Sequence, residues 1–374
     1  MRIKTLSDVR ISRGTRVLLR GDFDVAVRAG KIKDDFRLRA IIPTIEFIIG
    51  HGGCPRLMGH MGRPHGKKTA QASLKPVAEY ISRALRRRVL FVGDPRIFDK
   101  NMDGRQEILF FENLRFFKGE EENSSLFARR LSRWGDLYID DAFANAHRAH
   151  ASVDKIARLL PSAAGLRFIE EVKALGRLLQ GPRRPAVAVL GGAKLETKLP
   201  LIERFLKIGY EVLVGGALVN PALPFIINKR NLSPLRRIIS SPRLHLPVDL
   251  RVARSVRSRT RISGIGAVRA GEINYDIGPE TIQSFCASIR RAKTIVWNGP
   301  LGFAEYRKFA KGTVAIARAI AGSGTFSVMG GGDTIALLSQ YGVLKGFSHI
   351  SIGGGAMLEF LAGKKLPGVE VLRK

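Results

Sequence analysis

Short apolar runs recur along the whole chain, with longer amphipathic segments between them. The runs lie at 16–23, 54–60, 107–114, 136–142, 186–192, 211–216, 294–300, 325–332 and 349–355. Several are apolar at both odd and even positions, as strands covered on both faces are. Segments 74–88 and 198–209 instead repeat their apolar residues at helical spacing. Strands that alternate with helices indicate βαβ units, so the pattern predicts an α/β fold with parallel sheets.

The best candidate for a boundary between two halves is residues 158–183. A helical pattern lies there between Pro161 and Pro182, which predicts a helical hinge. Each half would then be a doubly wound, Rossmann-like sheet with its chemistry at the carboxyl ends of the strands. The length of 374 residues allows two or three domains.

Composition changes this picture little. The chain is 45% hydrophobic and 25% charged, which is typical of a soluble globular protein. Its two cysteines, Cys54 and Cys286, form no CxxC pair, so we expect a cytoplasmic protein. No run approaches the roughly 20 apolar residues of a membrane span, and the first residues lack the apolar core of a signal peptide.

The charge balance is unusual, with 63 Lys and Arg against 32 Asp and Glu. Nucleic-acid binding, anionic small substrates and a generally basic surface each account for it. The basic residues are scattered, aromatic residues are 7% of the chain, and no nucleic-acid motif accompanies them. We favour the generally basic surface, with incidental polyanion binding and no specific nucleic acid.

Glycine corners mark the second half. Gly330-Gly331-Gly332 and Gly353-Gly354-Gly355 each follow an apolar run, and "GGAKLETK" at 191–198 forms a third corner. Free N–H groups at such corners, with the amino-terminal end of the next helix, bind phosphate. Glycines also permit tight strand–helix packing. Three corners with Lys194, Lys198 and Asp333 favour a polyphosphate site, where the aspartate serves a hard cation.

In the first half, charged residues follow the apolar runs. Arg63, Arg115 and Arg148 lie at equivalent strand ends, and Arg37 lies at a predicted helix start behind Asp34 and Asp35. Converging arginines suit the bidentate capture of a phosphate or carboxylate. A lone arginine in a loop is usually solvated surface, but the shared position favours a common anion pocket.

Other chemistries lack their motifs. His147 and His150 have the spacing of metal ligands, but no further cluster completes a structural metal site. A nucleophile elbow, a Walker A loop and a GxGxxG dinucleotide turn are absent from the sequence. Two anion sites of different character therefore indicate phosphoryl transfer, which needs mainly positioning and charge stabilisation.

Motifs from residue 16 to residue 369 resemble the phosphoglycerate kinase family. They are "RVLLRGDFDV", "LMGHMGRPHG", "FFENLRFFKGEE", "DDAFANAHRAHAS", "LGGAKLETK", "DIGPETI", "IVWNGPLGFAEYRKFAKGT", "VMGGGDT" and "FSHISIGGGAMLEFLAGKKLPGV". The resemblance implies transfer of phosphate between 1,3-bisphosphoglycerate and ADP, giving 3-phosphoglycerate and ATP with Mg²⁺. It also implies a phosphoglycerate-binding domain at 1–158, a nucleotide-binding domain at 159–359, and a tail of about 360–374 packed on the first domain.

The resemblance assigns site residues by position. The substrate-binding residues would be Asp22, Phe23, Asp24, Arg37, His60, Met61, Gly62, Arg63, Arg115 and Arg148. The nucleotide-binding residues would be Gly191, Gly192, Lys194, Lys198, Gly215, Gly216, Asn298, Gly299, Glu305, Gly331, Gly332, Asp333 and Thr334. The residues at the transferring group would be Arg37, Lys198, Gly354 and Gly355. Glu305 would hold the ribose and Asp333 the magnesium of the nucleotide.

Three positions depart from the family pattern. Asp24 stands where the family usually has Asn, and a carboxylate beside a bound acid is repulsive unless it is paired or protonated. Thr197 replaces an Asp, and "GGALVN" at 215–220 replaces a Gly-Gly-Gly-Met-Ala-Asn segment. The alternative is a basic, nucleic-acid-associated protein on a catalytically impaired kinase scaffold. We expect a monomer.

Overall fold

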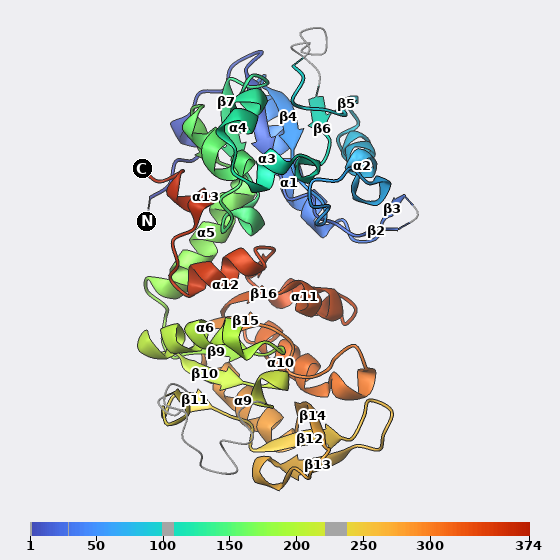
Figure 1. Ribbon diagram of the computed structural model, residues 1–374. Helices are drawn as coiled ribbons and strands as arrows, with labels where there is room; N and C mark the ends of the chain where they lie inside the picture. The colour runs from blue at the N-terminus through green and yellow to red at the C-terminus, as the bar shows by residue number, and fades with distance from the viewer. Residues whose placement is uncertain (1, 29, 99–107, 221–237) are drawn as a thin grey trace. The chain divides into compact units, whose positions relative to one another are not determined.

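The computed structural model describes residues 2–28, 30–98, 108–220 and 238–374. The chain divides into two compact units, Met1–Lys173 with Lys365–Lys374, and Ala174–Lys364. Each unit is built on a parallel six-stranded sheet (Figure 1). The α/β fold with two doubly wound sheets is thereby confirmed. Among the helices that the structure describes, none is long and apolar enough to span a bilayer.

The sheet of the first unit has the strand order β5-β6-β4-β1-β7-β8. Its strands are β1 (Arg16–Arg20), β4 (Cys54–Met58), β5 (Val89–Val92), β6 (Ile108–Phe111), β7 (Leu137–Asp140) and β8 (Ser162–Ala164). Its helices are α1 (Phe36–Gly50), α2 (Lys75–Leu85), α3 (Lys118–Glu121), α4 (Ser125–Ser132) and α13 (Pro367–Glu370), and β2 (Val27–Arg28) and β3 (Lys31–Ile32) form a small hairpin. This sheet extends past residue 158, because β8 pairs with β7.

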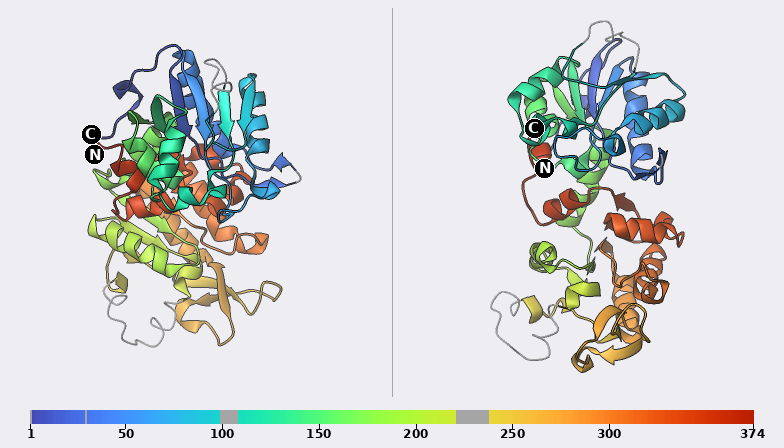
Figure 2. Two further views of the ribbon diagram at one scale, coloured as in Figure 1. Left: turned by 45° about the horizontal axis from the view of Figure 1, so that its top comes forward. Right: turned by 45° about the vertical axis from the view of Figure 1, so that its right-hand side comes forward.

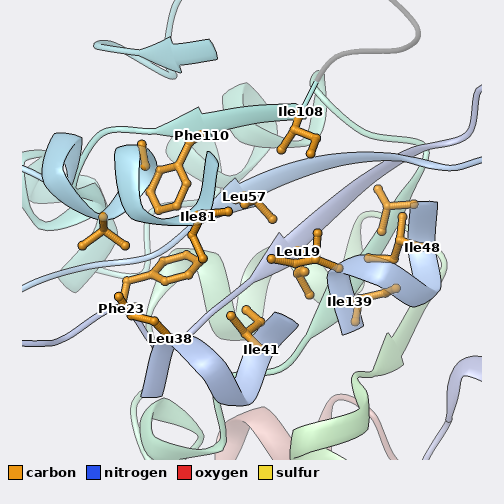
Figure 3. Close-up of a cluster of buried hydrophobic side chains, with 14 of the residues drawn as sticks. Leu19, Phe23, Leu38, Ile41, Ile48, Leu57, Ile81, Ile108, Phe110 and Ile139 are labelled. Atoms are coloured by element: carbon orange, nitrogen blue, oxygen red, sulfur yellow. The ribbon is translucent and has the colours of Figure 1, made fainter. Parts of the chain in front are cut away.

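Alternate side chains of β1 enter different cores, which explains its apolar run. Val17 and Leu19 pack with α1 and α2 in one cluster, and Figure 3 shows Leu19 close to Ile41 in it. Leu18 packs with α4 in a second cluster on the other face. Helices cover both faces of this sheet (Figure 2). A strand covered on both faces needs apolar residues at every position.

Helix α1 begins where the sequence predicts it. The N–H of Phe36 donates to Asp34 Oδ1 at 2.9 Å, which satisfies one of the free donors at the helix start. Leu38, Ile41 and Ile45 then recur on the face that the sheet covers. This start places Arg37 in the first turn of the helix.

The sheet of the second unit has the order β11-β10-β9-β15-β16-β17. Its strands are β9 (Ala186–Leu190), β10 (Glu211–Val214), β11 (Leu244–His245), β15 (Thr294–Asn298), β16 (Phe326–Gly330) and β17 (His349–Ser351). Its helices are α6 (Leu195–Lys207), α9 (Pro279–Arg291), α10 (Lys311–Ala321), α11 (Gly332–Ser339) and α12 (Gly355–Leu361). Helices α9 and α10 cover one face through Phe285, Ile289 and Ile316, and α6 contacts β9 and β10.

A three-stranded antiparallel sheet in the second unit was not predicted. Its order is β13 (Arg261–Gly264), β12 (Asp249–Ala253), β14 (Ile273–Ile277). The basic residues of segment 251–261, interpreted from sequence as scattered charge, lie in β12, in β13 and in the loop between them. Arg261 forms an ion pair of 2.5 Å with Glu272 beside β14, so part of this charge holds the sheet together.

Helix α5 (Leu166–Leu179) fills the predicted connector and crosses the division between the units at residues 173 and 174. Both ends of the chain belong to the first unit. Ile3 bridges to Arg373, the N–H of Lys4 donates to the carbonyl of Leu372 at 2.7 Å, and Gly368 donates to Ala146. Figure 1 marks the two ends of the chain side by side. The terminal segment therefore adds to the first unit rather than to the second.

Candidate active site

The charged residues of the first unit follow four neighbouring strands at one edge of the sheet. Asp22 follows β1, His60 follows β4, Arg115 follows β6 and Arg148 follows β7. The order β6-β4-β1-β7 makes these strands adjacent, and they are all parallel. Residues from separate parts of the sequence therefore gather at the carboxyl edge, where ligands of such sheets bind.

Arg37 reaches this edge from the first turn of α1. Its Nη1 donates to both carboxylate oxygens of Asp22, at 3.0 and 3.2 Å. Burial raises the pKa of Asp22, while Arg37 opposes that rise. The side chain of Arg37 keeps 31% of its exposure, so its guanidinium can bind a ligand while Asp22 orients it.

Asp24 is paired in the structure. Its Oδ1 accepts the N–H of Gly62 at 2.9 Å, and its Oδ2 lies 3.9 Å from His60 Nε2. The loop after β1 is thus tied to the loop after β4. The pairing reduces the repulsion expected from a carboxylate at this position, but 42% of the side chain remains exposed and open to a ligand.

Arg115 is the most buried arginine of the predicted set. Its Nη1 donates to the carbonyl of Gly62 at 2.7 Å, and its Nε lies 3.4 Å from Glu121. Its Nη2 is buried without a hydrogen-bond partner among the described residues. Burial, with the charge of Arg148 as the next cause, lowers the pKa of Arg115 to about 10. A cation held this way favours the arrival of an anion.

The remaining predicted residues of the first unit lie at the same loops. Phe23 is buried against Phe110, with ring centroids 4.8 Å apart, and Met61 is buried beside it. Arg63 is exposed and forms no ion pair with any residue that the structure describes.

His150 lies 3.7 Å from Glu120, and burial lowers its pKa to about 3. Within the described ranges, no three His, Cys, Asp or Glu side chains cluster as metal ligands.

In the second unit, the glycine corners also gather at the carboxyl edge of the sheet. Some of them serve packing: a Cβ on Gly191 or Gly299 would collide with the opposite corner, and the N–H of Gly192 donates to the Pro300 carbonyl at 2.9 Å. Others are open, since a Cβ on Gly332 or Gly354 would meet no atom within 4 Å. The packing interpretation therefore holds at Gly191 and Gly299, whereas the backbone at Gly332 and Gly354 leaves room for a ligand.

Lys198 is the buried cation of this edge. It is 6% exposed, and its Nζ donates to Asn298 Oδ1. Asn298 in turn donates from Nδ2 to the carbonyl of Gly330 at 3.0 Å, which links the corners after β9, β15 and β16. Burial lowers the pKa of Lys198 to about 8. Lys198 donates to one neutral oxygen and forms no ion pair with a described residue, so its charge is left for a phosphate to neutralise.

The other predicted nucleotide residues differ in exposure. Lys194 caps α6 and is exposed, and Asp333 is exposed in the first turn of α11 without an ion pair to any described residue. Thr334 is buried, and its Oγ1 has no partner among the described residues. Gly215 and Gly216 follow β10, and Gly216 accepts from Asn274 at 3.0 Å. Glu305 is exposed in the loop after β15 and forms no ion pair with any residue in the described ranges.

A buried polar network behind the first pocket was missed in the sequence. Arg20, Glu120 and Ser152 are fully buried, and His60 is 3% exposed. Arg20 donates to Ser152 and contacts His60, and Ser152 donates to Glu120 at 2.6 Å. The available signal was an arginine that ends a strand covered on both faces, where a charge must find partners.

Residues 6–364 match the family model of phosphoglycerate kinase. The chain belongs to the phosphoglycerate kinase family. It is a kinase that transfers phosphate reversibly between the acyl phosphate of 1,3-bisphosphoglycerate and ADP, a reaction of glycolysis.

Individual relatives agree. The phosphoglycerate kinase of Desulforudis audaxviator is 40% identical over 389 residues and covers 99% of both chains. That of Moorella thermoacetica is 39% identical, with 98% of both chains covered. The solved structure of phosphoglycerate kinase from Coxiella burnetii is 35% identical with a TM-score of 0.87, and each chain is covered to 99%. The nucleic-acid alternative finds no support among these relatives.

Proposed function

We propose that the first unit binds phosphoglycerate and the second binds the nucleotide with its magnesium. The first assignment rests on the gathering of Arg37, His60, Arg115 and Arg148 at one edge, where the buried Nη2 of Arg115 has no partner among the described residues. The second assignment, of the nucleotide, rests on Lys198 and on the open glycine corners at the same edge of the sheet. The arginines suit a small acid that carries a phosphate and a carboxylate. The glycine corners suit the chain of phosphates of a nucleotide.

The magnesium site fits the residues present. Asp333 offers an exposed carboxylate without a competing ion pair among the described residues, at the first turn of α11. Mg²⁺ is commonly held by one or two carboxylates together with substrate phosphates, so a single aspartate suffices. When bound, the ion neutralises charge on the nucleotide phosphates.

In the direction of ATP use, a carboxylate oxygen of 3-phosphoglycerate attacks the γ-phosphorus. The bond from that phosphorus to the β–γ bridging oxygen breaks, and ADP leaves. Arg37 and Lys198 stabilise the charge on the moving phosphoryl group, helped by the N–H groups at Gly354 and Gly355. Both ligands must meet for this step, so we propose that the units close on each other during the cycle, with α5 as the hinge.

Replacing Asp24 by Asn tests the assignment of the first pocket. The Asn oxygen can still accept the N–H of Gly62, while the carboxylate charge beside the bound acid is removed. We expect the KM for 3-phosphoglycerate to fall about 3- to 10-fold with little change in kcat, as a screened charge contact of roughly 1 kcal/mol predicts. A coupled assay with 3-phosphoglycerate and Mg-ATP measures both constants.

Asp34→Asn is the matched control, because it removes the same charge from an exposed carboxylate that caps α1. We expect it to leave the KM unchanged. An equal fall of KM in both variants would indicate a general effect of net charge, and an unchanged KM in Asp24→Asn would place the acid elsewhere.

The low pKa of Lys198 predicts an alkaline limit to activity. With a pKa of about 8, the free enzyme loses the ammonium as pH rises above 8. We expect kcat/KM for ATP to fall with an apparent pKa near 8, by about tenfold per pH unit above it. A Lys198→Arg variant stays charged over this range, so its residual kcat/KM should not fall above pH 8. A wild-type profile that stays level to pH 10 would contradict the role of Lys198.

A further inference from the structure

Each of the three guanidinium nitrogens of Arg20 has a hydrogen-bond partner. Nε donates to Ser152 Oγ at 3.0 Å, Nη1 donates to the carbonyl of Gly21, and Nη2 lies 3.0 Å from His60 Nδ1. The arginine is fully buried in β1. It therefore contacts the site through His60 and has no exposed surface of its own.

The contact with His60 determines the state of the ring. A guanidinium carries N–H donors and no acceptor, so Nδ1 of His60 must accept. The ring hydrogen is then on Nε2, the atom 3.9 Å from Asp24 Oδ2. The opposite tautomer would set two donors against each other, and so would the charged ring.

The surroundings of His60 also oppose a charge on it. Burial comes first, and Arg20, Arg115, His150 and Arg148 all face the ring and lower its pKa well below the usual range. Among the described residues, Asp24 is the carboxylate found within 4 Å of the ring, at 3.9 Å from Nε2, and its side chain is 42% exposed. His60 is thus a neutral hydrogen-bond donor, and the positive charge of the pocket is carried by the arginines.

A buried carboxylate supports Arg20 through Ser152. Glu120 accepts both the N–H and the hydroxyl of Ser152, at 3.0 and 2.6 Å, and the charge of Arg20 opposes the rise that burial causes in the pKa of Glu120. Tyr138 donates to the carbonyl of Ser152 at 2.8 Å. The position of Arg20 is therefore fixed from behind, independently of any ligand.

We propose that Arg20 is a positioning residue that fixes His60 as a neutral ring with its hydrogen on Nε2, directed toward Asp24 and the bound acid. His60 then supplies one oriented hydrogen bond to the ligand and no charge. The inference rests on the proposed binding of phosphoglycerate in the first unit. A role for Arg20 in packing alone would leave the tautomer of His60 free.

The tautomer is measured by ¹⁵N–¹H correlation spectra of the full chain labelled at histidine, between pH 5 and 8. The His60 signals are identified by their loss in His60→Gln. We expect one protonated and one unprotonated nitrogen that do not titrate in wild type, and mixed tautomers with a titration in Arg20→Gln. A hydrogen on Nδ1, titration of wild-type His60, or an unchanged His60 spectrum in Arg20→Gln overturns the proposal.

Two pairs of variants supply the kinetic test. Gln at position 60 places an amide nitrogen near the site of Nε2, whereas Asn places it near Nδ1, so His60→Asn should raise the KM for 3-phosphoglycerate about tenfold more than His60→Gln. Arg20→Gln should raise that KM about tenfold and make it depend on pH between 5 and 8. Arg16→Gln, at the far end of the same strand, should do neither.

If Arg20→Gln does not fold, Ser152→Ala removes the acceptor of Arg20 Nε and should shift the spectrum of His60 in the same direction. The reverse order of the two His60 variants, or no spectral change in Ser152→Ala, overturns the proposal. A wild-type chain that fails to bind 3-phosphoglycerate refutes the proposed site instead, while the spectra still decide the tautomer.

Discussion

Replacing Arg37 by Ala is expected to lower kcat by about 10²–10⁴, as the loss of a charge contact made in the transition state does. The reason lies in its position: α1 presents the guanidinium at the carboxyl edge of the sheet, and Asp22 holds it there through two hydrogen bonds. Steady-state kinetics in the coupled assay measure the effect, and a melting curve checks that the variant is folded.

Arg39→Ala is the matched control. It lies on the same helix, pairs with Asp35 at 2.9 Å and keeps 67% of its side-chain exposure. We expect its kcat to stay within about twofold of wild type, since isolated surface pairs contribute little. Similar kcat values for Arg37→Ala and Arg39→Ala would show that Arg37 does not act on the phosphoryl group.

Replacing Lys198 by Ala is expected to lower kcat by a similar factor of about 10²–10⁴ while the protein keeps its melting temperature. Burial lowers the pKa of this lysine, so its charge costs free energy in the ligand-free protein, and its removal relieves that cost. A loss of activity without a loss of stability is typical of a functional residue that is not needed for the fold.

Lys207→Ala removes an exposed lysine from the last turn of the same helix, α6, and serves as the control. We expect near wild-type kcat for it. A Lys198→Ala enzyme that turns over at the wild-type rate, or one that unfolds under conditions where Lys207→Ala is stable, would contradict the proposed role of Lys198.

Much of this fold could be predicted because the sheets are parallel and covered on both faces. Such strands are continuous apolar runs, and the polar residues that follow them must gather at one edge. The positions of Asp22, His60 and Arg115 at neighbouring strand ends follow from this rule. The start of α1 could be predicted as well, because Asp34 is a local capping signal.

The antiparallel sheet could not be predicted in the same way. Its strands carry Arg251 and Arg261, so the apolar alternation that marks a half-covered strand is interrupted. Arg261 is fixed by Glu272, which lies beside β14 and outside β13 itself. A pattern of charge along the chain does not contain that information.

The buried network of the first unit was hidden for a related reason. Arg20, Glu120 and Ser152 come from separate segments. Arg20 ends a buried strand and so indicates a buried charge, but Glu120 and Ser152 each resemble an ordinary surface residue in the sequence. Only the fold shows that all three are buried and bonded to one another. The roles of all the site residues stay predictions, and those of Arg63 and Glu305 rest on the family resemblance alone, because both side chains are exposed and form no ion pair with a described residue.

The most direct measurement is a pair of calorimetric titrations on Arg37→Ala and Lys198→Ala, each with 3-phosphoglycerate and with Mg-ADP. Arg37→Ala should bind 3-phosphoglycerate at least about tenfold more weakly and Mg-ADP as wild type does, and Lys198→Ala should show the reverse. If each substitution weakened the other ligand instead, or if neither affected binding, the assignment of the acid to the first unit and the nucleotide to the second would be wrong.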